Sequence, residues 1–159
     1  MFNCDQLTQL VIKPAIADLN LYSEDAVELL IFTCANESQG GTYLSQIKGP
    51  ALGIYQMEPN TYNDIWQNYI HNNQSLLLQL THNFDLHQMP SEQRMIYDLR
   101  FATAMARIHY DRVKAKIPPA RDIDGLWNYY KTYYNTSEGK ADVMKAKNAY
   151  HRFKSNLCL

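Results

Sequence analysis

Apolar residues recur at helical spacing along almost the whole chain, and this pattern constrains the fold more than any other feature. Val27, Leu30, Ile31 and Cys34 follow the i, i+3, i+4, i+7 spacing of one helix face. Alternating polar and apolar residues, which would indicate a strand, form no convincing run outside the middle of the chain. We therefore predict a mainly α fold, with little or no β-structure around residues 42–57.

Proline, glycine and capping residues divide this pattern into separate helices. A first helix is predicted over residues 5–20 with a bend at Pro14, and a second begins after Ser23 and stops at Gly40-Gly41. Residues 41–60 are predicted to form a loop or a short irregular hairpin. A further helix is predicted from Thr61, where Thr61 and Asp64 resemble a capping box. Four more are predicted: a short one within residues 71–90, one over residues 90–116, one from Asp122 to about residue 135, and one from residues 137–138 toward Phe153.

The length and composition indicate one globular domain that spans residues 1–159. A chain of 159 residues fits a single domain, and no internal repeat or linker interrupts it. The shares of apolar residues (46%) and charged residues (19%) argue against disorder. No apolar run reaches the length of a membrane-spanning helix, so no stable membrane insertion is expected. The first twenty residues also lack the basic start and apolar block of a signal peptide.

The charge balance and the metal-binding residue types exclude several classes of function. Fifteen basic and sixteen acidic side chains give a net charge of −1, which argues against a nucleic-acid partner. Cys4, Cys34 and Cys158 form neither a disulfide framework nor a zinc spacing. The five histidines show no i, i+4 pairing and are interpreted as surface or satisfied side chains. We therefore predict no metal and no cofactor.

Tyrosine is unusually frequent, and four of the twelve tyrosines lie within six positions: Tyr129, Tyr130, Tyr133 and Tyr134. A tyrosine offers a flat apolar face and a polar tip, which suits a groove for a ligand that is both apolar and hydroxylated. The same spacing also fits an amphipathic helix whose aromatic stripe belongs to the core. The residues alone leave both interpretations open.

Glu37 lies on the apolar face of the second predicted helix, in its last turn. At about 100° per residue, its side chain lies within about 20° of Leu30 and about 60° of Cys34. Partial burial disfavours a charged carboxylate, and the negative end of the helix dipole repels it. Such a carboxyl stays protonated closer to neutral pH, as a general acid requires. The alternative is a glutamate that reaches into solvent at a frayed helix end.

A second segment, residues 51–61, favours a functional role for Glu37 over that alternative. Together with Glu37-Ser38 it resembles the lytic transglycosylase branch of the lysozyme superfamily, in which a catalytic Glu-Ser is followed by an A-x-G-L-M-Q-x-x-P-x-T segment. The matching residues are Ala51, Gly53, Gln56, Pro59 and Thr61, while Ile54 and Tyr55 replace the Leu and Met. Tyr133-Tyr134-Asn135 matches a third family element, an aromatic-Tyr-Asn sequence near the end of a later helix.

The resemblance implies a lysozyme-like helical domain with a saccharide-binding cleft, and Glu37 as its catalytic residue. In the family, the Glu protonates the oxygen of the β-1,4 bond between N-acetylmuramic acid and N-acetylglucosamine. It then acts as a base on the muramic 6-hydroxyl, and a 1,6-anhydro ring closes without water. The implied substrate-binding residues are Ser38, Gly53, Tyr55, Gln56, Tyr134 and Asn135, with Tyr134 near the Glu and Asn135 toward the sugar.

Two other functions remain open beside the transglycosylase. A goose-type-like lysozyme would use water and a second carboxylate, for which Glu58 is the candidate because it follows Gln56 in the predicted cleft floor. A virion structural or saccharide-binding protein would keep the fold without turnover.

The resemblance is strongest to the peptidoglycan-degrading enzymes of tailed bacteriophages. It implies peptidoglycan glycan strands as the partner, with other virion proteins as further candidates. The implied location is the phage virion or the host cytoplasm before release, with action in the host periplasm and cell wall.

Overall fold

The computed structural model describes residues 1–135 and 142–156, and helices dominate this part of the chain. The prediction of a mainly α fold is confirmed. The elements are α1 (Cys4–Leu7), the π-helical turn η1 (Thr8–Ile12), α2 (Lys13–Ala17), α3 (Glu24–Ser38), α4 (Pro59–Ile65), the π-helical turn η2 (Trp66–Ile70), α5 (Gln74–Phe84), α6 (Arg94–Tyr97), α7 (Leu99–Asp111), α8 (Ile123–Tyr133) and α9 (Val143–Lys154).

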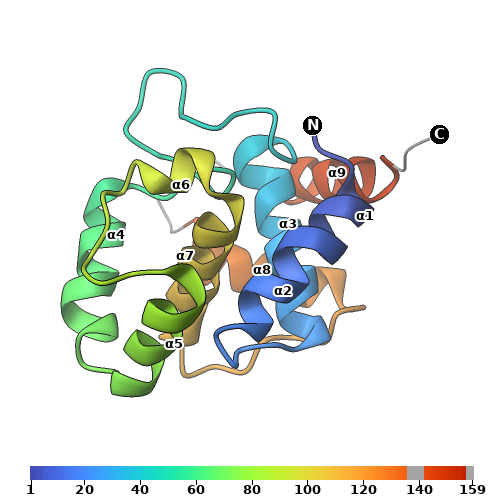
Figure 1. Cartoon of the computed structure of the whole chain (residues 1–159). Helices are drawn as coiled ribbons and strands as arrows, with labels where there is room; N and C mark the ends of the chain where they lie inside the picture. The colour runs from blue at the N-terminus through green and yellow to red at the C-terminus, as the bar shows by residue number, and fades with distance from the viewer. Residues whose placement is uncertain (136–141, 157–159) are drawn as a thin grey trace.

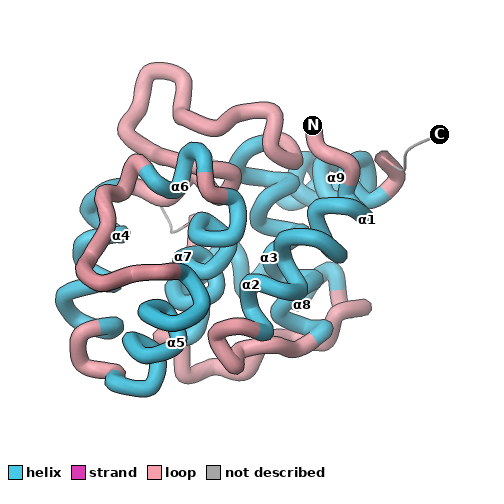
Figure 2. The backbone as a smooth tube through the Cα atoms, viewed as in Figure 1, coloured by secondary structure: helices cyan, strands magenta, loops and turns pink. Residues whose placement is uncertain are grey.

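The helices form two groups with α7 between them, as Figure 1 shows. One group contains α4, α5 and α6, and the other contains α1, α2, α3, α8 and α9. Helix α3 is largely buried and contacts α7, α8 and α9, while the long loop after α3 projects beyond both groups (Figure 2). Two isolated bridges, Ser45 with Leu52 and Leu52 with Met57, are the whole β-structure of the described residues, as predicted for residues 42–57.

The N-terminal helical segment contains a π-helical turn immediately before Pro14. Pro14 has no N–H group, and its ring would clash with the carbonyl of residue 10 in a regular α-helix. The wider turn of η1 (Thr8–Ile12) lets the chain continue into α2, in whose first turn Pro14 stands. The predicted irregularity at this proline therefore takes the form of a π turn.

Helix α3 begins and ends close to the predicted positions. The hydroxyl of Ser23 accepts a hydrogen bond from the amide of Ala26 at 3.0 Å, as expected of an N-cap. The helix ends at Ser38, two residues before the predicted stop, because Gln39 already adopts a left-handed conformation with φ 52°. Gly40 and Gly41 continue at positive φ and turn the chain into the loop.

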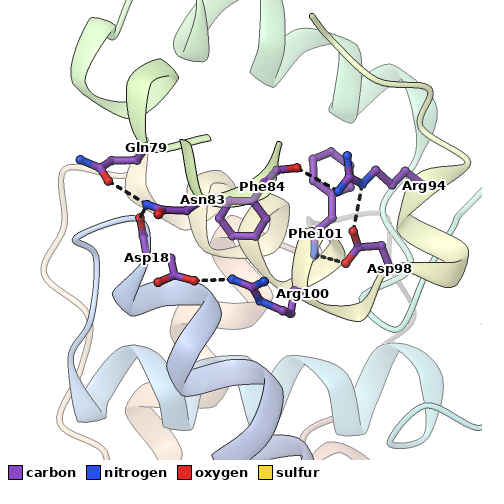
Figure 3. Close-up of polar contacts among 8 residues, drawn as sticks. All are labelled: Asp18, Gln79, Asn83, Phe84, Arg94, Asp98, Arg100 and Phe101. Atoms are coloured by element: carbon purple, nitrogen blue, oxygen red, sulfur yellow. Dashed lines mark hydrogen bonds and ion pairs between the residues drawn. The ribbon is translucent and has the colours of Figure 1, made fainter. Parts of the chain in front are cut away.

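The predicted continuous helix over residues 90–116 is wrong. The chain forms two helices, α6 and α7, that are separated at Asp98, and α7 ends at Asp111. The Asp98 carboxylate accepts hydrogen bonds from the amide of Phe101 and from Arg94 Nε, both at 2.9 Å (Figure 3). An aspartate stabilises a helix start better than a helix interior, so the cap prevails over the apolar stripe.

Two other predicted helix starts differ from the structure or lie outside it. The capping box at Thr61 and Asp64 is wrong, because α4 already begins at Pro59, a residue suited to the first turn of a helix. Helix α9 begins at Val143 with Asp142 as its N-cap. The predicted start at residues 137–138 lies outside the described residues.

Polar contacts around the end of α5 connect the two groups of helices (Figure 3). Asn83 donates a hydrogen bond to the carbonyl of Asp18 at 2.7 Å, and Arg100 forms an ion pair with the Asp18 carboxylate. Arg94 donates to the carbonyl of Phe84 at 3.0 Å. These contacts fix the last turn of α5 against the end of α2 and against α6, and they join α7 to the end of α2.

One cluster of buried apolar side chains runs through the described part of the chain, from Cys4 to Phe153. Cys4 and Cys34 are buried free thiols within it, while Cys158 lies outside the described residues. None of the helices in residues 1–135 and 142–156 is long and apolar enough to span a membrane.

Candidate functional site

Glu37 lies in the last turn of α3, where its carboxylate is partly buried and hydrogen-bonded. Tyr130 donates its hydroxyl proton to Glu37 Oε1 at 2.7 Å, and the amide of Asn135 donates to the same oxygen at 3.4 Å. Burial raises the pKa of the Glu37 carboxyl above its usual value, while these two hydrogen bonds lower it and only partly compensate. The net shift is upward, and burial is its cause, in the direction expected for a carboxyl on the apolar face of the helix.

Three cavities meet at Glu37. The first, here called the Gln46 cavity, has a volume of 310 Å³ and is lined by Glu37, Tyr43, Gln46, Ile47, Ala51, Gln56 and Glu58. The second, the Tyr134 cavity, has a volume of 530 Å³ and shares four of these residues while reaching Thr61, His109, Tyr134 and Asn135. The third, the α9 cavity, has a volume of 370 Å³ and lies between α3, α8 and α9. Open space thus adjoins the Glu37 carboxyl on several sides.

Five of the residues predicted for the site line this space: Glu37, Gln56, Glu58, Tyr134 and Asn135. Gln56 adopts a positive φ of 46°, and its side-chain amide donates to the carbonyl of Gly53 at 2.8 Å. Glu58 is exposed at the N-terminus of α4 and lines both the Gln46 cavity and the Tyr134 cavity. The structure therefore brings residues from α3, α4 and α8 to one place.

Ser38, Gly53 and Tyr55 do not line the three cavities but lie behind them. Ser38 is fully buried, and its hydroxyl donates to the carbonyl of Ile54 at 2.6 Å while it accepts from the amide of Gly41 at 2.9 Å. The Tyr55 hydroxyl is buried 3.3 Å from the hydroxyl of Thr103. The resemblance implies that these three residues contact the substrate directly. The structure does not support such contacts, because the hydroxyls of Ser38 and Tyr55 bind other protein groups and Gly53 lies behind the cavities.

Gly53 is required by close packing of the cavity floor against α6. It has a φ of +73°, and a Cβ atom on it would lie 2.4 Å from the backbone carbonyl oxygen of Met95. Any other residue would meet both backbone strain and a collision with an atom that cannot rotate away. The glycine that the motif resemblance singled out at this position therefore has a structural cause in the backbone.

The tyrosine that contacts Glu37 is Tyr130, and the prediction that assigned this place to Tyr134 needs correction. Tyr134 donates its hydroxyl proton to the carbonyl of Tyr55 at 2.8 Å. The two rings lie one helical turn apart with nearly parallel planes, at 19° and a centroid distance of 6.3 Å. The buried rings of Tyr129 and Tyr130 belong to the core, as the second interpretation predicts, and the Tyr130 hydroxyl reaches Glu37. The i, i+4 spacing of Tyr130 and Tyr134 was the available signal.

His109 is a further lining residue that the sequence analysis did not assign to the site. Its Nε2 lies 3.1 Å from the carbonyl of Tyr133, and Arg112 contacts its Nδ1 at 2.6 Å. Burial and the nearby Arg112 charge lower the pKa of His109 to about 4, so the ring is neutral at pH 7. A neutral ring with Nε2–H donates to the carbonyl at the end of α8 and accepts from the guanidinium. This is the satisfied histidine that the sequence analysis expected, placed beside Asn135.

The Tyr130 hydrogen bond gives a test of the electrostatics at Glu37. Since this bond stabilises the charged carboxylate, Tyr130→Phe is expected to raise the pKa of Glu37 further. A carboxyl-detected NMR titration measures that pKa directly. Tyr134→Phe is the matched control, because it removes a hydroxyl on the same helix that binds a backbone carbonyl instead. An equal rise in both variants would contradict the assignment of Tyr130.

Among the residues that the structure describes, no three His, Cys, Asp or Glu side chains form a group that could hold a metal ion. A comparison of the chain with protein-family models, with curated proteins and with solved structures finds no significant match.

Proposed function

We propose that the chain is a peptidoglycan lytic transglycosylase with Glu37 as its general acid and base. The observation that carries this proposal is the Glu37 carboxyl itself, which has a raised pKa, a hydrogen bond from Tyr130 and open space on several sides. A protonated carboxyl beside a cavity suits general-acid cleavage of a glycosidic bond. The motif resemblance at residues 37–38, 51–61 and 133–135 supplies the substrate class.

In the first step, Glu37 donates its proton to the oxygen of the β-1,4 bond between N-acetylmuramic acid and N-acetylglucosamine. The bond from that oxygen to the muramic anomeric carbon breaks, and the N-acetylglucosamine end leaves with a new hydroxyl group. Glu37 is then a carboxylate, which the Tyr130 and Asn135 hydrogen bonds stabilise. The same contacts that moderate its pKa therefore support the charge that appears during the reaction.

In the second step, the Glu37 carboxylate accepts the proton of the muramic 6-hydroxyl. That oxygen bonds to the anomeric carbon, so a 1,6-anhydro ring closes and Glu37 regains its proton. The attacking hydroxyl belongs to the same sugar and is already close at high effective concentration. One carboxyl thus serves both steps, and no second acidic residue is needed.

The product chemistry tests this proposal. We expect soluble muropeptides released from purified cell walls to end in 1,6-anhydromuramic acid, as read from their masses. We also expect Glu58→Gln to keep substantial activity, because the tethered hydroxyl replaces an activated water. Muropeptides with reducing-end muramic acid, together with an inactive Glu58→Gln variant, would contradict the transglycosylase and favour hydrolysis.

A hydrolase is the second candidate, and one observation favours it. Glu58 is an exposed carboxylate that lines two of the three cavities at Glu37, the Gln46 cavity and the Tyr134 cavity. An inverting hydrolase places its two carboxyls about 6.5–9.5 Å apart, with the attacking water between them. Glu58 also lies immediately before α4, where a negative charge stabilises the positive end of the helix. That structural role explains its position equally well.

The proposal extends to the biological setting that the resemblance implies. We propose a bacteriophage enzyme of host wall lysis or penetration that acts on glycan strands in the host periplasm and cell wall. A zymogram on purified walls separates this enzyme from a saccharide-binding or virion structural protein with the same fold. A clear zone from the wild-type chain is the expected result, and binding to walls without any clearing would favour the non-catalytic protein.

A further inference from the structure

Helix α9 carries cationic side chains on both flanks of its buried face. Lys145 and Arg152 lie on one flank, and Lys147 and Lys154 lie on the other. Seven residues span about two helical turns, so the members of each pair share a side of the helix. The side chains between the flanks are buried: Ala146, Tyr150 and Phe153.

The flank with Lys147 and Lys154 is engaged within the protein. Lys147 forms an ion pair with Asp124 of α8, and Lys154 forms one with Glu28 of α3 at 2.9 Å. These cations help to attach α9 to its two neighbouring helices. The charges on this flank therefore have structural partners.

The flank with Lys145 and Arg152 faces the α9 cavity, which Glu37 also lines. Neither cation forms an ion pair with a residue that the structure describes. Besides Glu37, this cavity contains one acidic residue, Asp142, which caps the helix by accepting from the amide of Lys145 at 2.9 Å. Two positive charges without an ion-pair partner among the described residues thus lie in the same cavity as the Glu37 carboxyl.

The charge along the three cavities is therefore uneven. The Gln46 cavity and the Tyr134 cavity contain Glu58, and the His109 ring beside them is neutral at pH 7. No lysine or arginine is among the described residues that line those two cavities, although Arg112 contacts the His109 ring. An extended ligand that spans all three cavities would place an anionic group at α9 and neutral groups at the other end.

We propose that Lys145 and Arg152 bind the carboxylates of the peptide stems that glycan strands carry on muramic acid. This inference rests on the proposed function and assigns the α9 cavity to the peptide-bearing part of that substrate. A guanidinium and an ammonium both pair with carboxylates, and their positions two turns apart suit a stem with more than one acidic group. The expected contribution is modest, because exposed ion pairs are weak and are screened by salt.

A binding experiment tests the assignment separately from catalysis. Soluble glycan fragments with stem peptides, and the same fragments after an amidase has removed the peptides and left only the lactyl carboxylate on muramic acid, are titrated calorimetrically into the Glu37→Gln chain, which should not cleave them. Peptide-bearing fragments are expected to bind about three- to tenfold more tightly, with a ratio that declines as salt is added. Adding Lys145→Gln and Arg152→Gln should bring this ratio close to one.

Two further variants act as controls. Lys114→Gln with Lys116→Gln removes the same charge from an exposed loop outside the three cavities and should leave the ratio unchanged. The double variant with Lys145→Arg and Arg152→Lys keeps both positive charges and should also keep the binding ratio of the parent chain.

The outcomes separate this inference from the proposed function. A ratio near one in the parent chain, or an equal loss of the ratio in the loop variant, would overturn the inference. Failure of the wild-type chain to cleave the peptide-bearing strands, with the binding ratio intact, would overturn only the proposed function.

Discussion

Glu37→Gln is expected to lower glycan cleavage by several orders of magnitude while the thermal midpoint stays level or rises. The glutamine cannot donate the proton that the leaving oxygen needs, so the chemical step loses its acid. The substitution also removes a carboxyl whose charged form is disfavoured by burial. The release of soluble muropeptides and a thermal melt measure the two effects. More than a few per cent of residual activity would contradict the assignment of Glu37.

Glu28→Gln is a matched control on the same helix. Glu28 also accepts a hydrogen bond from a tyrosine, Tyr150 at 2.6 Å, and pairs with Lys154. It lies away from the three cavities, so its amide variant should keep full activity and lose some stability. Glu37 and Glu28 of α3 are thus expected to respond in opposite ways.

The stability difference between the Glu37→Gln chain and the wild type should depend on pH. The Glu37 pKa lies above its ordinary value near 4.5 in the folded protein, so the folded state binds more protons than the unfolded state between those two values. The free energy of unfolding therefore falls as the pH rises through that window. Below it the two proteins should melt alike, and above it the Gln variant should gain its full advantage.

Gly53→Ala is expected to cost on the order of 2–4 kcal/mol of unfolding free energy. The added Cβ would stand 2.4 Å from the Met95 carbonyl oxygen at a φ that side chains rarely adopt. Chemical denaturation measures the loss. Gly49→Ala is the control in the same loop, since its Cβ meets only the movable side chain of Gln46 and Gly49 has no positive φ. Similar losses in both variants would show that the loop, and not the close approach to Met95, determines the effect.

Elements with strong local signals could be predicted from the sequence. Ser23 and the apolar spacing that follows it defined α3, and Asp122 defined the start of α8. The break at Asp98 was missed because the apolar stripe continues through it, and only the tertiary structure shows that its carboxylate caps α7. The π turn before Pro14 was likewise visible only as an irregularity.

Only part of the site could be predicted from the sequence, because Tyr130 and His109 were missed and three predicted residues lie behind the cavities. The motif placed Glu37, Gln56 and Asn135 together, and the structure brings them to one set of cavities. The sequence could not show that Tyr130, and not Tyr134, contacts Glu37, because both tyrosines lie on one helix face. The path of the chain at the end of α8 decides which hydroxyl reaches which oxygen. The backbone role of Ser38 depends on a contact sixteen residues away in sequence, which helix spacing does not encode.

The hydrogen bonds behind the cavities have a consequence for the entropy of catalysis. Ser38 of α3 and Tyr134 at the end of α8 hold the carbonyls of two consecutive residues, Ile54 and Tyr55. Two helices far apart in the chain are thereby fixed to one strip of backbone before any ligand arrives. The protein therefore has little conformational freedom left to lose there when substrate binds. For the glycan strand that we propose as substrate, we therefore expect the ordering cost of binding to fall mainly on the strand, and a longer strand to offset it through more contacts along the cavities.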